Sequence, residues 1–283
     1  MKKFCIIVDT STNIKPNEFE DVFVVPMIIT KNDGKIVKTL QDQIDITSNE
    51  LLNNMINGEV YKTASPVMGE CLSILEKTTQ MYKTVFVISL PKTISGTFNQ
   101  WKLLASEFDN VKVFDFPIVG DGCKEIIKDI FNMQEKTIDE IETYINDSHK
   151  KNAIGVILNE TKYLVRGGRM SMLKSMIVSL LKFKLFIYLN ENGLSLYGKS
   201  YKFSSLLSIV KDMFTETISA NDKNVKVIYI FTSDASDIKF NNEKIVSALE
   251  KIFPSAQIKY SFLPSVIAAH VGPNYCAISA KVA

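Results

Sequence analysis

The run FCIIV (residues 4–8) and the segment DTST (9–12) directly after it set the pattern for the first half of the chain. An apolar, β-branched run that stops at a polar loop is typical of a buried strand, and such runs alternate here with segments of helical spacing. The alternation predicts an α/β fold with βαβ units around a mostly parallel sheet flanked by helices. Further strands are expected at 22–29, 85–89 and 111–114, and helices over 48–57, 67–79, 95–108, 122–134 and 137–150.

The polar segment NDSHKKN (146–152) separates this half from the rest of the chain. We expect two domains, one over residues 1–150 and one over 151–283. Two strands joined by NENG (190–193) predict a hairpin, so the second α/β domain should contain a mixed or antiparallel sheet. Its other expected elements are strands at 153–158, 225–231 and 257–263, a Gly-Gly turn at 167–168, and helices at 171–181, from 204 onward and at 242–251.

Composition limits the function. The 283 residues carry a formal net charge of only +2, without the basic excess of a nucleic-acid-binding protein. The four cysteines lack the spacing of a zinc or redox motif and indicate buried thiols, so a cytoplasmic location is expected. The uncharged stretch 260–280 is long enough to span a bilayer, but Pro264, Gly272 and Pro273 would break a spanning helix, and strand plus loop is expected there.

Three hydroxyl-rich loops are candidates for binding: residues 9–12, TASP (63–66) and KTISGTF (92–98). Ligands of α/β sheets lie at the carboxyl ends of the strands, where these loops would converge. Taken singly, each loop is more simply a helix N-cap. Together, hydroxyls and free N–H groups at helix N-termini suit an anion. No Walker or GxGxxG motif is present, which favours a small carboxylate over a nucleotide phosphate.

Two other kinds of site are weaker. A hydrolase with Ser89 or Ser95 as nucleophile and His270 as base lacks the GxSxG elbow and an orienting acid. With two histidines and no cysteine or carboxylate cluster, neither a metal site nor a cofactor is expected. The two arginines of the chain, Arg166 and Arg169, bracket the glycine turn. They would grip a carboxylate or backbone carbonyls, or, as the simpler interpretation, form a structural salt bridge.

The segments IIVDTSTNI, TASP, ISGTF, YLVRGGRMS and VIAAHVGP occur in the order and spacing of the DegV family, which the chain resembles from Asp9 to Ile278. The resemblance implies two α/β domains with a long-chain fatty acid buried between them. It implies carboxylate contacts from Thr63, from Ser95 and Gly96 of the Ser-Gly-Thr motif, and from His270. Finally, it implies the lipid-carrying, non-catalytic subunit of a bacterial fatty acid kinase that serves phospholipid synthesis, with an ATP-binding kinase subunit as partner and transient contact with a membrane surface.

The expected head-group site is uncharged, with two hydroxyls and a helix N-terminus satisfying the carboxylate without a fixed counter-charge. His270 is expected to donate to the carboxylate or to steady the acyl phosphate. The chain departs from the family pattern in that TASP replaces TSQPS and Tyr201 stands where the family has an arginine linked to the kinase. Arg166, Arg169 and Tyr201 are therefore candidates for a kinase-contact loop, and a lipid carrier or sensor without kinase coupling stays an alternative.

Overall fold

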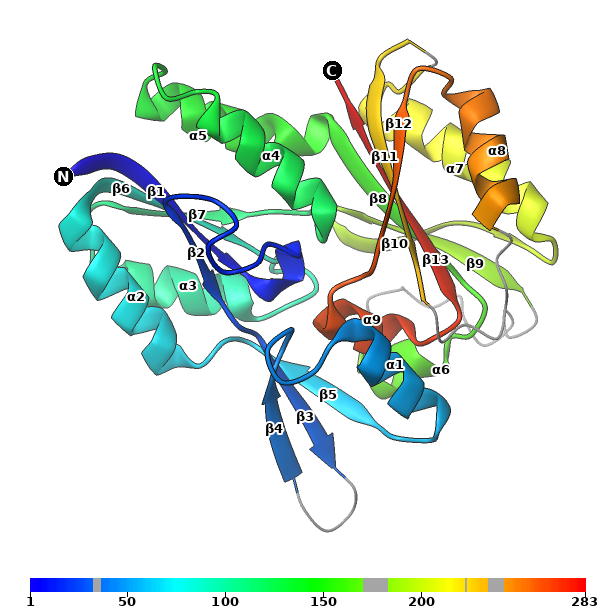
Figure 1. Ribbon diagram of the computed structural model, residues 1–283, viewed down its shortest axis with the longest axis horizontal. Helices are drawn as coiled ribbons and strands as arrows, with labels where there is room; N and C mark the ends of the chain where they lie inside the picture. Colours follow the sequence, from blue (N-terminus) through cyan, green and yellow to red (C-terminus); the bar gives the residue numbers. More distant parts are fainter. Residues whose placement is uncertain (33–36, 170–182, 222, 234–241) are drawn as a thin grey trace.

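The computed structural model describes residues 1–32, 37–169, 183–221, 223–233 and 242–283. The expected helix at 171–181 lies outside these ranges. Figure 1 shows two large sheets side by side, each with its own helices. No helix of the described residues combines the length and the apolar character that crossing a bilayer requires.

The first sheet is parallel, as predicted, with strand order β2-β1-β6-β7. In β1, Phe4, Ile6 and Val8 face one layer of helices, whereas Cys5 and Ile7 face the other, and burial on both faces explains the continuous apolar run. Helices α4 and α5 cover the first face, and α2 and α3 the second. The elements are β1 (Lys2–Asp9), β2 (Val22–Val25), β6 (Tyr82–Ser89), β7 (Val111–Asp115), α2 (Met68–Met81), α3 (Thr97–Ala105), α4 (Asp121–Phe131) and α5 (Ile138–Asp147).

The second sheet is mixed, as predicted, with order β10-β9-β8-β13-β11-β12 and only β11 and β12 parallel. One face packs against α7 and α8, and the other faces the first half together with α6 and α9. The elements are β8 (Asn152–Leu158), β9 (Lys184–Asn190), β10 (Gly193–Ser200), β11 (Val225–Thr232), β12 (Gln257–Ser261), β13 (Tyr275–Val282), α6 (Lys162–Arg166), α7 (Phe203–Ile218), α8 (Asn242–Ile252) and α9 (Ser265–Val271).

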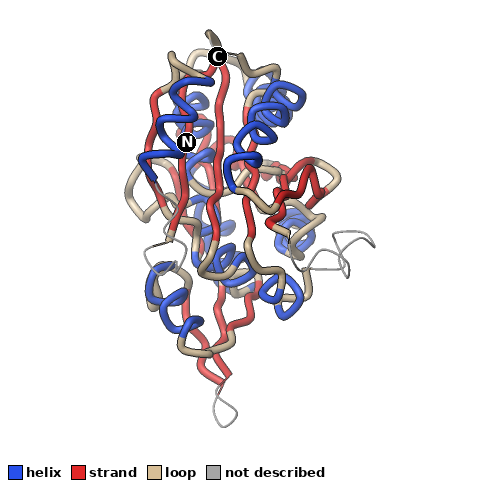
Figure 2. The backbone as a smooth tube through the Cα atoms, turned by 90° about the vertical axis from the view of Figure 1, so that its right-hand side faces the viewer, coloured by secondary structure: helices blue, strands red, loops and turns tan. Residues whose placement is uncertain are grey.

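A small antiparallel sheet, β4-β3-β5, was not predicted. The run 22–29, expected as one strand, divides at Pro26 and Met27: β2 ends at Val25, and β3 (Ile28–Asn32) pairs instead with β4 (Val37–Gln41) and β5 (Tyr61–Ala64). This sheet projects from one end of the molecule, near α1 (Ser48–Ile56) (Figures 1 and 2). It brings the TASP loop to the space between the large sheets.

The expectation of strand plus loop for residues 260–280 is confirmed at both ends of the stretch but wrong for residues 265–271, which are helical. This stretch contains the end of β12, helix α9 and most of β13, which is buried along its whole length at the centre of the second sheet. Helix α9 has seven residues, too few for a periodic pattern, and Gly272 with φ of +82° ends it. Gly272 was expected to break a spanning helix, and in the structure it ends a short helix that carries His270.

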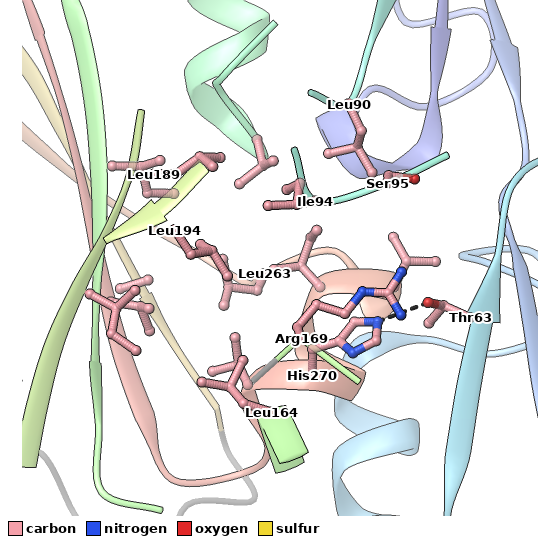
Figure 3. A pocket seen from close by; sticks show the side chains of 18 of the residues that line it. Thr63, Leu90, Ile94, Ser95, Leu164, Arg169, Leu189, Leu194, Leu263 and His270 are labelled. Atoms are coloured by element: carbon pink, nitrogen blue, oxygen red, sulfur yellow. Dashed lines mark hydrogen bonds between the residues drawn. The ribbon is translucent and has the colours of Figure 1, made fainter. Parts of the chain in front are cut away.

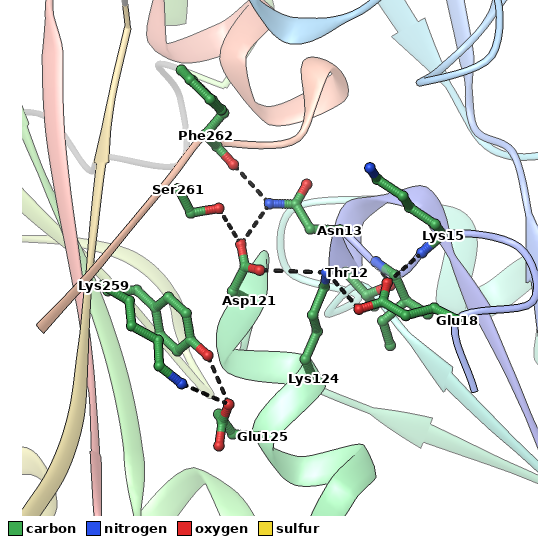
Figure 4. Close-up of polar contacts among 12 residues, drawn as sticks. Thr12, Asn13, Lys15, Glu18, Asp121, Lys124, Glu125, Lys259, Ser261 and Phe262 are labelled. Atoms are coloured by element: carbon green, nitrogen blue, oxygen red, sulfur yellow. Dashed lines mark hydrogen bonds and ion pairs between the residues drawn. The ribbon is translucent and has the colours of Figure 1, made fainter. Parts of the chain in front are cut away.

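Helix α4 links the two halves through carboxylates spaced four residues apart. Asp121 accepts a hydrogen bond from Ser261 (Figure 4), and Glu125 accepts one from Tyr229 at 2.7 Å. Asp129 pairs with Lys281. Residues three and four apart share a helix face, so these contacts all reach the second sheet from the same side. They fix the separation of the sheets, and therefore the space between them. The domain boundary at residue 150 stays a prediction.

Candidate functional site

An apolar cavity lies between the second sheet and the first half of the chain. Its empty volume, which includes the part open to solvent, is about 860 Å³. Strand register sets one wall. Ala277, Val156 and Ile187 form a row across β13, β8 and β9, and Ile154, Leu189 and Leu194 form the next row across β8, β9 and β10. The opposite wall includes Met27, Leu90, Ile94, Val119, Leu263 and Val266.

Four polar side chains lie together on one side of this cavity. Figure 3 shows Thr63, Ser95, Arg169 and His270 opposite the apolar side formed by Leu189 and Leu194. They come from β5, the loop before α3, the loop after α6, and α9. The cavity is thus amphipathic, with an apolar body and a polar end.

His270 bonds to Thr63, with 2.8 Å between Nε2 and Oγ1. Burial and, to a smaller extent, the charge of Arg169 together lower the pKa of His270 to about 4, so the ring is neutral at pH 7. Its Nδ1 is buried without a hydrogen-bond partner among the described residues. The ring packs against Gly167, where a Cβ would lie 2.0 Å from Nδ1. The first glycine of the turn is therefore required by the position of the histidine.

Arg169 corrects the expectation of an uncharged head-group site, because its guanidinium lines the same cavity beside His270. Nη1 donates to the carbonyl of Gly167 at 2.8 Å, and burial lowers the pKa of the guanidinium. Among the described residues its recorded partner is a backbone carbonyl, and the salt-bridge interpretation is not supported. A guanidinium has five N–H donors in a planar fork, so it can bond a carboxylate as well as a carbonyl.

The other two candidates for a kinase-contact loop lie away from this cavity. Arg166 is exposed in the last turn of α6. Tyr201 is 64% exposed and packs against Phe183 with ring centroids 4.2 Å apart. Neither residue lines the cavity.

Ser95 precedes α3 and lines the cavity, while the exposed Gly96 is the N-cap residue of that helix. The Oγ of Ser95 accepts from the backbone N–H of Thr97 at 3.2 Å and contacts the Thr97 hydroxyl at 2.8 Å. The residue thus serves helix initiation and still borders the cavity, so the capping and binding interpretations are compatible.

The first hydroxyl loop does not join the other two. Asp9 caps the short 3-10 helix Thr10–Thr12, accepting from the N–H of Ser11 at 2.9 Å. The Thr10 hydroxyl donates to the buried Asp42 at 2.7 Å. None of residues 9–12 lines the cavity, and the prediction that all three loops converge is wrong for this one.

A hydrolytic triad is not assembled among the described residues. The hydroxyl bonded to His270 belongs to Thr63, and the recorded contacts of Ser95 and Ser89 are to Thr97 and to a backbone carbonyl. No carboxylate bonds the other ring nitrogen of His270 within the described part of the chain. The same described residues contain no group of three side chains that could ligate a metal ion.

The fold and the cavity define an α/β protein with an amphipathic site between two sheets. The family model described as an uncharacterised protein, DegV family, matches residues 3–282, and the chain belongs to the DegV family. A DegV domain-containing protein of Mycoplasma genitalium is 28% identical, over 99% of this chain and 98% of the relative. One from Staphylococcus aureus is 27% identical over 96% of each chain.

Solved structures share the fold. The chain resembles a DegV protein of Bacillus subtilis described as fatty acid binding, with a TM-score of 0.82, 19% identity and full coverage of both chains. It also resembles the fatty acid kinase B3 protein of Streptococcus pneumoniae loaded with linoleic acid, with a TM-score of 0.79 and 17% identity over 99% of this chain and 100% of that one.

Proposed function

We propose that this protein binds a long-chain fatty acid between its two sheets and presents the carboxylate to a separate ATP-dependent kinase. The observation that carries the proposal is the separation of the cavity into an apolar body and one polar end. Each methylene buried from water contributes about 0.8 kcal/mol, so a long acyl tail supplies most of the affinity. The linoleic acid in the Streptococcus pneumoniae protein and the description of the Bacillus subtilis protein as fatty acid binding support the choice of ligand.

The polar end matches a carboxylate. A carboxylate leaving water needs hydrogen-bond donors. Thr63 and Ser95 provide hydroxyls, and Arg169 provides a charged fork. In one tautomer of the neutral His270, Nε2–H donates to the Thr63 oxygen and leaves the Thr63 proton for the ligand; in the other, Nε2 accepts the Thr63 proton.

The direct test is mass spectrometry of the freshly purified, denatured protein, in which we expect a co-purified fatty acid. Thr63→Ala and Ser95→Ala should each weaken binding by about 1–3 kcal/mol, the usual effect of leaving a buried polar group unsatisfied. Titration with a fluorescent fatty acid measures the change, with the exposed Thr143→Ala on α5 as control. Unchanged affinity in both cavity variants would contradict this placement of the head group.

Arg169→Met should weaken binding more for a fatty acid than for the fatty alcohol of equal length. The guanidinium offers a charge-assisted bond worth about 1.5–3 kcal/mol, and it favours the ionised head group. Isothermal titration with both ligands measures the difference, and Arg166→Met, which alters the exposed arginine, is the matched control. An equal loss for acid and alcohol would assign Arg169 to packing alone.

Kinase coupling is the finer part of the proposal. Reconstitution with the ATP-binding kinase subunit of the same organism should yield acyl phosphate. The alternative of a lipid carrier or sensor without kinase coupling comes from Tyr201, which is exposed and stands where the family pattern has an arginine. Fatty acid binding without acyl phosphate would favour that alternative, and acquisition of coupling by Tyr201→Arg would locate the cause at this residue.

A further inference from the structure

A chain of three hydroxyls leads away from the cavity. Ser95 Oγ lies 2.8 Å from Thr97 Oγ1, and Thr97 Oγ1 donates to Ser65 Oγ at 3.0 Å. Thr97 is the first residue of α3, is fully buried and does not line the cavity. We propose that Thr97 is a positioning residue that turns the Ser95 hydroxyl toward the ligand carboxylate, an inference that rests on the proposed function.

The single proton of each hydroxyl determines which oxygen donates in each of these hydrogen bonds. A hydroxyl has one proton. Because Thr97 gives its proton to Ser65, the proton in the 2.8 Å contact comes from Ser95. Without ligand, the Ser95 proton is thus directed toward Thr97. Figure 3 shows the oxygen of Ser95 on the side away from Leu189 and Leu194.

A bound carboxylate reverses this order. An ionised carboxylate only accepts hydrogen bonds, so Ser95 must turn its proton to the ligand. The Ser95 oxygen then accepts from the Thr97 hydroxyl, in addition to the Thr97 N–H that already donates to it at 3.2 Å. A donor at Thr97 polarises the Ser95 hydroxyl and strengthens its bond to the carboxylate, because linked hydrogen bonds reinforce one another.

The geometry selects Thr97 for this role. Ser65 and Ser95 lie in loops and are partly exposed, whereas Thr97 is held by the first turn of a helix and has no access to water. Its hydroxyl has two recorded partners, one at each end of the chain. Valine has the shape of threonine without the hydroxyl and therefore removes the relay while filling the same space.

The test is the affinity for hexadecanoic acid of the wild-type protein, Thr97→Val, Thr97→Ser, Ser95→Ala and the double variant Ser95→Ala/Thr97→Val. We expect Thr97→Val to weaken binding about three- to ten-fold, as for one net hydrogen bond, and Thr97→Ser to restore it. Because Thr97 acts through Ser95, the double variant should bind like Ser95→Ala alone. Thermal melting confirms that each variant folds, and Thr97→Ala replaces Thr97→Val if the latter does not.

The outcomes separate the two proposals. If Ser95→Ala weakens binding but Thr97→Val does not, the positioning role is wrong and fatty acid binding stands. If Thr97→Val weakens binding by the same factor in the wild-type protein and in Ser95→Ala, Thr97 acts through the fold and not through Ser95, and the positioning role is also wrong. If the wild-type protein does not bind hexadecanoic acid, the proposed function itself is wrong.

Discussion

Replacing Ala277 with phenylalanine is expected to weaken binding of hexadecanoic acid by about 100-fold or more, since a ring that displaces about four methylenes removes about 3 kcal/mol of burial. Ala277 lies on the central strand β13, in register with Val156, and both line the cavity. A larger side chain at this position projects into the space assigned to the acyl tail. Stability should be retained, because the added ring fills a void rather than a packed core.

The chain length of the ligand provides the control for Ala277→Phe. Octanoic acid needs less of the apolar space, so its affinity should fall by a smaller factor than that of hexadecanoic acid. Ala277→Leu should give an intermediate loss. Titration calorimetry with both acids and thermal melting of each variant measure these effects. Equal affinities of wild type and Ala277→Phe for hexadecanoic acid would place the acyl tail elsewhere.

The sequence predicts those features of the fold that have a local cause. The continuous apolar run at residues 4–8 indicates a buried strand, and the packing of Ile6 and Ile7 into opposite helix layers confirms it. The hairpin at 190–193 follows from its turn residues, and β9 pairs with β10 across it. Motif order also selected Thr63, Ser95 and His270, which the structure brings to one cavity. Their roles as ligand contacts stay predictions.

Features that depend on distant contacts were missed. The strand β5 is short and carries polar residues, and it forms only because it pairs with β3. Arg169 is sequence-adjacent to a glycine turn, but the ring of His270, about a hundred residues later, packs on that turn and fixes the arginine beside the cavity. In the sequence, the two arginines of the chain both lie at this turn, which marks the turn as unusual. The sequence does not show in which direction the Arg169 side chain points.

Asp42→Asn is expected to change the way in which the free energy of unfolding depends on pH, because Asp42 is one of two buried acids near α9. Burial raises the pKa of Asp42 to about 6, and it also raises that of Asp9. A carboxyl with a raised pKa in the folded state stabilises the protein below its unfolded pKa of 3.8, and this stability is lost as the pH rises through about 6. At about 1.4 kcal/mol for each pH unit between the two pKa values, the contribution of Asp42 is about 3 kcal/mol.

His270 contributes to the free energy of unfolding with the opposite pH dependence, over a similar pH range. Its pKa falls from 6.5 to about 4 on folding, so the stability that it contributes is present above pH 6.5 and is lost as the pH falls through 4. In the wild-type protein the two contributions largely cancel between these values. Asp42→Asn removes one of them and leaves the histidine. The variant should therefore lose about 2–3 kcal/mol more than the wild type between pH 7.5 and pH 4.

Urea unfolding at a series of pH values measures this difference, because the midpoint and slope give the free energy of unfolding at each pH. Asp109→Asn, at an exposed turn, should follow the wild-type curve. His270→Gln should show the reverse of Asp42→Asn, losing less stability than the wild type on acidification. Parallel curves for Asp42→Asn and the wild type would mean that the Asp42 carboxyl titrates alike in the folded and unfolded chains, and that burial beside α9 does not hold its proton.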